Sequence, residues 1–446
     1  MAKRENKSKL TLLKFLMFIL DIILVQASVL IVYYIRLFIY FKNRNFYPTM
    51  GIKPYIITYP IITFLIIFLF YLYGLYSPER KNWRENFVSI IAVFLIMFLF
   101  KTFISYFFRV FGFPRSVLIL STFIEIPIFL SYRYYFWKLL LKFTEIKKII
   151  LLKKEKDLVF NQILDETIKI EKTISIDEDF DLKTIEEYIK NGYDIMLTSS
   201  FEPNFKKQLS QIVINYNRSL IILPDLYDFL ILSSEINPGE GKVFINFKGF
   251  ELTENAKIIK RIFDIFFSLI TLIILSPLFL IIAIAIKIND FGPVFYKQER
   301  IGENFKKFYI IKFRSMVVNA EKNTGPVLAT DNDTRITKIG KFLRKYRLDE
   351  IPQFINVLKG NMSIVGPRPE REFFVNKFIE INPLYKYRFN TKPGITGLAQ
   401  IYSKYDTSFE EKLLYDLLYI VKWSFYLDLW IIILTIRAIL SPESAK

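Results

Sequence analysis

The sequence predicts a membrane protein that combines transmembrane helices with two α/β domains. The chain has 446 residues, 52% of them hydrophobic, with 46 Phe and 27 Tyr, a composition typical of membrane proteins. Long uncharged runs fill the N-terminal third, and short apolar runs alternate with polar helical stretches after it. We therefore expect a four-helix transmembrane bundle (1–143), a small Rossmann-like α/β domain without a glycine-rich loop (144–250), and a monotopic α/β domain with a re-entrant membrane helix (256–446).

Charge and residue types exclude several classes of function. The net charge of +18 fits contact with anionic lipid headgroups and phosphate substrates. Nucleic acid is not expected as a partner, because no recognised nucleic-acid motif accompanies the charge. The chain has no Cys and no His, which excludes disulfides, Cys-bound metals and Ser-His or Cys-His catalysis. Acid–base chemistry must therefore use Asp, Glu, Lys or Tyr.

Four apolar runs in the first domain reach the length that a bilayer core requires. They are Leu12–Ile39, Tyr55–Tyr73, Phe87–Phe107 and Ser116–Leu139. Lys101 interrupts the third run and Glu125 the fourth, so we expect these charges to pair inside the bundle. Basic residues before the first run and after the fourth favour a cytoplasmic location for both ends.

The middle segment predicts a small parallel sheet. Its strand-like runs are KKIILL, YDIMLTSS and RSLIILP, separated by helical stretches such as DLKTIEEYIKNG. No glycines follow the first strand, so no dinucleotide is expected there. Gly239 and Gly241 flank Glu240 ahead of the strand-like VFINF and predict a hairpin turn.

The uncharged run Ile265–Ile286 is interrupted by Ser276 and Pro277 near its midpoint and has basic residues on both flanks. Proline removes a helical hydrogen bond and bends the helix. Each half would span roughly 18 Å, too short to cross the ~30 Å core. We expect a re-entrant helix over about 263–287, with Ser276 bonding a carbonyl freed at the bend; a kinked spanning helix is the alternative.

The last domain is polar and centred on the stretch RLDEIPQFINVLKGNMSIVGPRPE, residues 347–370. Asp349 and Glu350 precede Pro352 and a helical run that ends at Gly360, which places Asp349 at or beside a helix N-cap. Such an N-terminus binds phosphate readily. Taken alone, an Asp-Glu pair is almost always a solvated surface turn. Its surroundings favour phosphate chemistry with a divalent cation.

Many basic residues lie ahead of this stretch or within it. They are Arg300, Lys312, Arg314, Arg335, Arg344, Arg347 and Arg368. Pro367 and Pro369 flank Arg368 and predict a rigid turn that fixes it in place. A second tight turn is expected over Gly394–Gly397, and an apolar helix over about 420–440 is expected to lie at the membrane interface.

These residues together resemble the bacterial sugar transferases, the polyprenyl-phosphate hexose-1-phosphate transferases. The matching motifs follow one another over residues 260–400: KRIFDI, Ser276-Pro277, GPVF, QERIG, KFRSM, DTRITKIGKFLRK, LDEIPQFINVLKGNMSIVGPRPE and KPGITGLAQ. Four spans and a degenerate α/β domain ahead of them resemble the large subgroup. One departure is Phe305, where members usually carry glycine, and it bears on the local turn only.

The resemblance implies transfer of a hexose-1-phosphate from a UDP-sugar to undecaprenyl phosphate, with release of UMP and with Mg²⁺. It implies that Asp349 is the nucleophile, forming an aspartyl-phosphosugar intermediate, and that Glu350, together with Asp349, holds the metal. Lys312, Arg314, Arg335, Arg347, Pro367, Arg368 and Pro369 are the expected residues for phosphate or uridine. The enzyme would initiate exopolysaccharide, capsule or O-antigen synthesis at the cytoplasmic face of the bacterial inner membrane.

Two other classes of function stay open on the sequence. A membrane-anchored nucleotide-sugar dehydratase or epimerase would need a glycine-rich NAD loop and a Tyr-x-x-x-Lys pair, and the only such spacing we weigh, Tyr134 to Lys138, lies in the fourth apolar run. A non-catalytic polysaccharide-assembly scaffold would release no UMP. The sugar, the pathway, a ligand of the middle domain and homodimer formation are not determined by the sequence.

Overall fold

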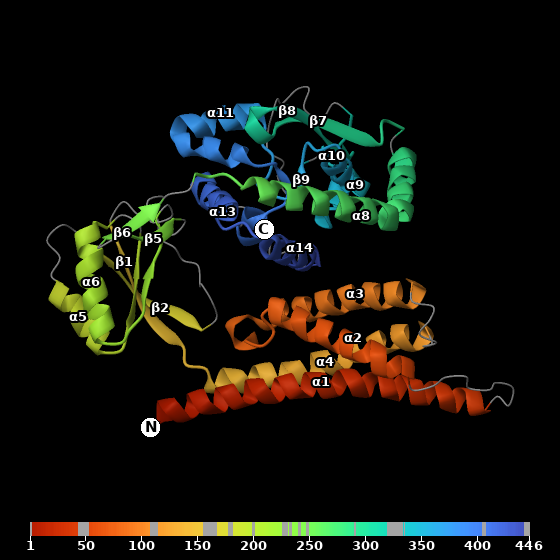
Figure 1. The fold of residues 1–446 in the computed structure, drawn as a ribbon, viewed down its shortest axis with the longest axis horizontal. Coiled ribbons are helices and arrows are strands. Elements are labelled where there is room, and N and C mark those ends of the chain that lie inside the picture. The colour runs from red at the N-terminus through yellow and green to blue at the C-terminus, as the bar shows by residue number, and fades with distance from the viewer. Residues whose placement is uncertain are drawn as a thin grey trace. The chain divides into compact units, whose positions relative to one another are not determined.

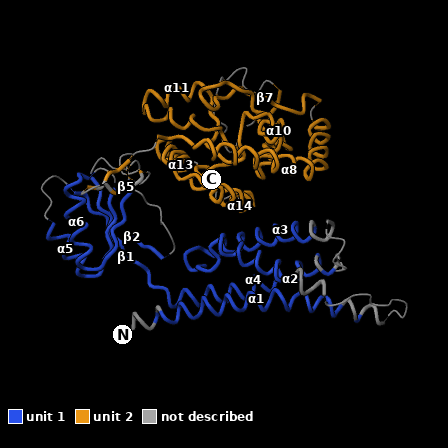
Figure 2. Tube along the Cα trace, in the orientation of Figure 1, with its two compact units in different colours: residues 1–225 blue, residues 226–446 orange. Residues whose placement is uncertain are grey.

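The computed structural model divides the chain into two compact units, residues 1–225 and 226–446 (Figures 1 and 2). It describes residues 2–42, 53–107, 115–154, 167–176, 182–198, 201–224, 231, 234–239, 242–246, 249–289, 291–318, 333, 335–403 and 407–440.

Unit 1 begins with four helices. They are α1 (Ala2–Lys42), α2 (Lys53–Leu72), α3 (Trp83–Phe107) and α4 (Arg115–Phe143), with a 3-10 turn η1 (Pro78–Arg80) between α2 and α3. α4 packs against α1 and α3, and α2 contacts both α1 and α3. Lys101 on α3 and Glu125 on α4 form a fully buried ion pair of 2.6 Å, which confirms the expected pairing. A second buried pair, Arg133–Asp21, joins α4 to α1 at 2.6 Å.

Length and composition select three helices that could cross a membrane among the described residues: Ser8–Ile35 within α1, Trp83–Thr102 within α3, and Glu254–Asn289. The apolar part of α2, Tyr59–Leu72, is shorter, and α4, which carries two buried charges, is not selected. Apolar helices near the N-terminus therefore fit membrane association. Two of the four expected spans meet this criterion.

Unit 1 also holds the predicted parallel sheet. The strands β1 (Lys147–Lys153), β2 (Ile168–Ser175), β3 (Asp194–Leu197) and β4 (Leu220–Ile222) follow the order β2-β1-β3-β4, and every pairing is parallel. Helices α5 (Leu182–Lys190) and α6 (Pro203–Asn215) cover one face, where they pack on Leu152 and Leu197. The α/β prediction is confirmed, although β2 was not foreseen.

Unit 2 opens with an antiparallel hairpin of β5 (Glu235–Gly239) and β6 (Lys242–Asn246), in which Gly239 lies opposite Lys242. The predicted hairpin is confirmed. The long helix α8 (Glu254–Asn289) follows, and only 11% of its apolar window is buried.

Helix α8 consists of two arms that meet at a sharp bend (Figure 1). Pro277 is the proline inside it, and we attribute the bend to this residue, since its missing N–H leaves the carbonyl of Ile273 without its helical partner. The hydroxyl of Ser276 donates to that carbonyl at 2.8 Å. The expected interruption is thus a bend in one continuous helix.

Both arms of α8 pack on the polar domain of unit 2. Phe263 and Phe267 of the first arm pack against its main hydrophobic core, and Ile282 and Ile286 of the second arm pack with Phe313. The domain comprises β7 (Phe295–Ile301), η3 (Glu303–Phe305), β8 (Lys307–Phe313), α9 (Lys338–Lys345), η4 (Leu348–Glu350), α10 (Gln353–Leu358), β9 (Ser363–Val365), α11 (Glu372–Ile381), η5 (Pro383–Asn390), β10 (Gly394–Thr396), α12 (Leu398–Tyr402), α13 (Phe409–Val421) and α14 (Phe425–Leu440).

Two local predictions need correction or comment. The stretch from Gly394, expected as a tight turn, is instead strand β10, which pairs in parallel with β9. A Cβ on Gly394 would lie 2.1 Å from the amide nitrogen of Gly366, so glycine allows this close approach. Phe305 has a φ of 60°, a conformation that glycine adopts more easily, and its ring packs on Phe389 at 4.8 Å between centroids.

Candidate active site

The Asp349–Glu350 dyad lies in the 3-10 turn η4, directly ahead of α10. The helical turn begins at Leu348 as expected. The cap positions are Arg347 for η4 and Pro352 for α10, so Asp349 lies two residues after the N-cap of η4 instead of at or beside an N-cap. Arg347 adopts a left-handed conformation with a φ of 53°. The left-handed conformation of Arg347 reverses the direction of the chain between α9 and η4. The two consecutive acids of η4 therefore follow α9 directly.

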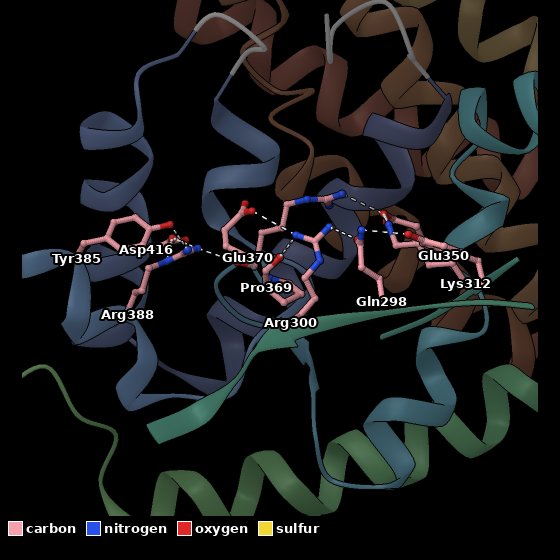
Figure 3. A network of polar contacts seen from close by, with 11 residues as sticks. Gln298, Arg300, Lys312, Glu350, Pro369, Glu370, Tyr385, Arg388 and Asp416 are labelled. Carbon is pink, nitrogen blue, oxygen red and sulfur yellow. Dashed lines mark hydrogen bonds and ion pairs between the residues drawn. The ribbon is translucent and has the colours of Figure 1, made fainter. Parts of the chain in front are cut away.

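Glu350 is held by two cations. Lys312 on β8 donates to Oε1 of Glu350 at 2.8 Å, and Nη2 of Arg368 donates to the same oxygen at 3.1 Å (Figure 3). The Glu350 side chain is only 12% exposed, whereas that of Arg368 is 45% exposed. The guanidinium of Arg368 is therefore within reach of a substrate while it is anchored on the dyad.

The two carboxylates have opposite pKa shifts. Burial and the adjacent charge of Glu350 raise the pKa of Asp349 above its ordinary value, while Lys312, Arg344 and Arg368 act in the other direction. For Glu350, burial would also raise the pKa, but Lys312, Arg368 and Arg347 outweigh it and hold the pKa well below its ordinary value. The site therefore combines a firmly ionised carboxylate with a less stable anion beside it.

The segment Gly366–Glu370 follows β9 and carries Arg368 between its two prolines. Pro367 accepts a hydrogen bond on its carbonyl from Gly394 N at 2.9 Å, and Pro369 accepts one from Arg300 Nη1 at 3.1 Å. Both prolines thus serve as backbone acceptors, which fixes the turn that the sequence predicts.

Arg344 and Arg347 lie on the approach to η4. Nε of Arg344 donates to the hydroxyl of Ser315 at 2.8 Å, which ties α9 to the end of β8. The charges close enough to act on Asp349 are those of Glu350, Lys312, Arg344 and Arg368, and Asp349 in turn acts on Arg347.

Arg314 and Arg335 have other partners in the structure. Arg314 is buried, and its guanidinium lies so close to Gly292 that a Cβ there would be 1.8 Å from Nη1. Arg335 binds Asp333 through Nε at 2.8 Å and through Nη2 at 2.6 Å, and this pairing lowers the pKa of Asp333 to about 2. Their contact with a substrate stays a prediction.

Several residues that support Arg368 carry no clear signal in the sequence. Arg388 and Tyr385 on η5, Asp416 on α13, and Gln298 on β7 form a continuous polar network with Arg300 and Glu370 (Figure 3). Arg388 is 5% exposed and lies in the aromatic stretch PLYKYRFN, where a charge flanked by rings was the only signal of a buried partner.

The sequence of this domain is similar to that of a family of known proteins. The profile of the bacterial sugar transferases matches residues 255–442. A UDP-N-acetylgalactosamine-undecaprenyl-phosphate N-acetylgalactosaminephosphotransferase of Aeromonas hydrophila is 44% identical over 191 residues, covering 42% of this chain and 45% of that protein.

Two UDP-glucose:undecaprenyl-phosphate glucose-1-phosphate transferases are similar over a longer stretch. The protein of Klebsiella pneumoniae is 42% identical over 240 residues (53% of this chain, 51% of that protein), and that of Xanthomonas campestris pv. campestris is 38% identical over 269 residues (58% and 56%). The chain thus spans about half the length of the curated relatives it matches.

Proposed function

Because residues 255–442 belong to the bacterial sugar transferase family, we propose that this chain transfers a hexose-1-phosphate from a UDP-sugar to undecaprenyl phosphate and releases UMP. The observation that carries the proposal is the dyad itself: a buried Asp349 beside a Glu350 that Lys312 and Arg368 hold in place. Phosphoryl transfer depends on positioning and on cations that neutralise phosphate charge, and this cluster supplies both.

In the first step, a carboxylate oxygen of Asp349 attacks the phosphorus that bears the sugar. A bond forms between this oxygen and the phosphorus, the bond from the phosphorus to the bridging oxygen breaks, and UMP leaves with the electron pair. Arg368, with its exposed guanidinium, is placed to bind the phosphate oxygens during this step.

In the second step, a phosphate oxygen of undecaprenyl phosphate attacks the same phosphorus. The bond to Asp349 breaks, the carboxylate is regenerated, and the lipid diphosphate sugar is released. Neither displacement requires a net proton transfer when the lipid phosphate is a dianion. A chain without histidine can therefore complete the cycle.

The dyad fits Mg²⁺ in the mode in which one or two carboxylates share the ion with substrate phosphates. No cluster of three acidic or histidine ligands occurs among the described residues, so an all-protein site is not offered there. Glu350, with Asp349, would hold the ion, and the ion would neutralise phosphate charge when bound. Lys312 and Arg368 both donate to Oε1 of Glu350, so neither cation would have to leave for the carboxylate to hold the ion.

The proposal includes a membrane arrangement. We propose that α1–α4 cross the inner membrane and that α8 enters the cytoplasmic leaflet and returns, with α14 at the interface. The bend of α8, its low burial and the packing of both arms on one domain support this arrangement. The site would then meet the soluble donor and the lipid acceptor on the cytoplasmic side.

A panel of donors tests the function. Purified protein in vesicles with undecaprenyl phosphate is assayed for UMP release from UDP-glucose, UDP-galactose and their N-acetylated forms. We expect one donor to be turned over and Asp349→Asn to abolish release. Absence of UMP with every donor would reject the transferase and favour the scaffold.

A further inference from the structure

Four consecutive carbonyls in the segment that carries Arg368 accept hydrogen bonds from other elements. Pro367 O accepts from Gly394 N at 2.9 Å, and Arg368 O from Arg388 Nη2 at 2.9 Å. Pro369 O accepts from Arg300 Nη1 at 3.1 Å, and Glu370 O from Ile301 N at 3.0 Å. The backbone of this irregular segment is thus hydrogen-bonded at four residues in a row. Two of the four donors are arginine side chains.

Arg388 is anchored on three sides. Its Nη2 lies 2.7 Å from Asp416, its Nε donates to Asp416 at 3.0 Å, and its Nη1 donates to the hydroxyl of Tyr385. Arg388 and Asp416 are each 5% exposed or less as whole residues, so water cannot replace these bonds readily. Nη2 of Arg388 also donates to the carbonyl oxygen of Arg368.

Arg300 approaches the same segment from β7. Nη1 reaches both the carbonyl of Pro369 and the carboxylate of Glu370, at 3.1 and 3.3 Å, and Nη2 donates to Gln298 at 2.7 Å. Each guanidinium, buried in Arg388 and partly buried in Arg300, therefore has its own carboxylate, Asp416 or Glu370, and neither adds a free charge to the site. Their contribution is geometric.

We propose that Arg388 and Arg300 are positioning residues that set the place and direction of Arg368. The inference rests on the proposed function, since Arg368 is taken as the group that binds donor phosphate. A role in stability alone would be met by the ion pairs Arg388–Asp416 and Arg300–Glu370. These ion pairs alone would not require the further hydrogen bonds that Arg388 donates to the carbonyl of Arg368 and Arg300 to the carbonyl of Pro369. Those two bonds are the ones that can align Arg368.

Lysine substitutions separate the two roles. Arg388→Lys keeps a cation for Asp416, but a lysine lacks the planar fork that also reaches the carbonyl of Arg368. Arg300→Lys makes the same change on β7, where the side chain is 18% exposed and more tolerant. If Arg388→Lys does not fold, Arg300→Lys carries the test.

The test is a double-mutant cycle in which each lysine variant is made with Arg368 present and with Arg368→Ala. Two quantities are measured: kcat/KM for UMP release and the Kd of UDP by calorimetry. With Arg368 present we expect a loss on the order of tenfold to a hundredfold in kcat/KM, because a misplaced phosphate ligand loses alignment. In the Arg368→Ala background the same change should cost less than twofold.

Arg261→Lys is the matched control. Arg261 also donates to two backbone carbonyls, of Val357 at 2.6 Å and Leu358 at 2.9 Å, but these lie at the far end of α10. Its effect on kcat/KM should be equal in the two backgrounds. If Arg388→Lys and Arg300→Lys each lower kcat/KM by the same factor with Arg368 present and with Arg368→Ala, the positioning role is overturned.

The two readouts separate this inference from the function. If the wild-type protein binds UDP but releases no UMP, the proposed transferase activity is rejected. The double-mutant cycle measured with the Kd of UDP then still decides the positioning role. Wild-type protein that binds no UDP overturns both.

Discussion

The side chains of Asp349 and Glu350 are neighbours in the chain but have different surroundings. Lys312 and Arg368 bind Glu350 directly, so its negative charge is fully compensated. Asp349 is 8% exposed and feels those same cations together with the repulsion of Glu350. A carboxylate that is costly to ionise is more nucleophilic once ionised, whereas a saturated one is suited to anchoring. This difference supports the proposal that Asp349 is the reactive acid and that Glu350 serves as an anchor for cations.

The acid limb of the pH profile of kcat/KM should report the ionisation of Asp349. Its raised pKa means that activity is lost, as the pH falls, at a higher pH than for an ordinary Asp. Lys312→Met removes a cation that lowers this pKa, so the limb should move to higher pH. Glu350→Gln removes a like charge and should move the limb to lower pH. Shifts in the same direction would contradict the assignment.

Arg368→Lys should cost on the order of tenfold or more in kcat/KM for the donor, because an ammonium cannot form two parallel bonds to a phosphate. Lys422→Arg, at the exposed C-cap of α13, serves as a comparison for a surface cation and should stay within twofold. Steady-state kinetics with both substrates measures the change. Wild-type kinetics in Arg368→Lys would remove this residue from the site.

Among the elements, α9 shows how a short helix is locked against the strand that carries Lys312. A Cβ on Gly340 would lie 1.9 Å from the carbonyl oxygen of Ser315, and Thr337 caps the helix by accepting from Gly340 N at 2.9 Å. The helix therefore contacts the backbone after β8 directly, and Arg344 reaches Ser315 from it. The position of η4 depends on this contact.

Gly340→Ala should lower the free energy of unfolding by about 2 kcal/mol or more, since backbone has to shift to admit the methyl group. Gly249→Ala is the control, because nothing lies within 4 Å of a Cβ there. Thermal unfolding of the two variants gives the comparison. Equal Tm values would show that α9 is free to move away from Ser315.

Sequence patterns predicted those elements whose conformation depends on residues that are close together in the chain. Proline and serine in one apolar run predicted the bend of α8, since the freed carbonyl and its new donor are four residues apart or fewer. Strand β10 was missed because its glycines resemble a turn until β9, some thirty residues away, is brought beside it. At the site, the dyad and Arg368 were predicted from one contiguous motif. Arg388 and Asp416 were missed because only the tertiary fold joins η5 to α13.

For the whole molecule, the arrangement in the membrane decides whether the site meets its donor. The chain has no cysteine, so single cysteines can be introduced cleanly. Of the candidate probe positions, Asn323 lies outside the described residues, so we choose Asn376, which is exposed on α11, together with Asn191 in unit 1. An impermeant thiol reagent applied to intact cells should label neither, and both should react after permeabilisation. Labelling of Asn376→Cys alone from outside would exclude the re-entrant arrangement.

Pro277→Leu tests the cause of the bend. Leucine restores the N–H that can bond Ile273, in competition with Ser276, so the helix should straighten and activity should fall. Cysteine labelling at Asn376 in this variant follows the change. Unaltered labelling and activity would show that the packing of both arms, and not the proline, holds the bend.

The covalent role of Asp349 is the central claim, and intact-mass measurement tests it most directly. Wild-type protein is mixed with the UDP-sugar that it turns over, without lipid acceptor, and Asp349→Asn and Glu350→Gln are treated alike. We predict that the wild type gains the mass of one hexosyl phosphate and loses it when undecaprenyl phosphate is added, and that Asp349→Asn gains nothing. An adduct of the same mass on Asp349→Asn, or wild-type turnover without any adduct, would contradict the account.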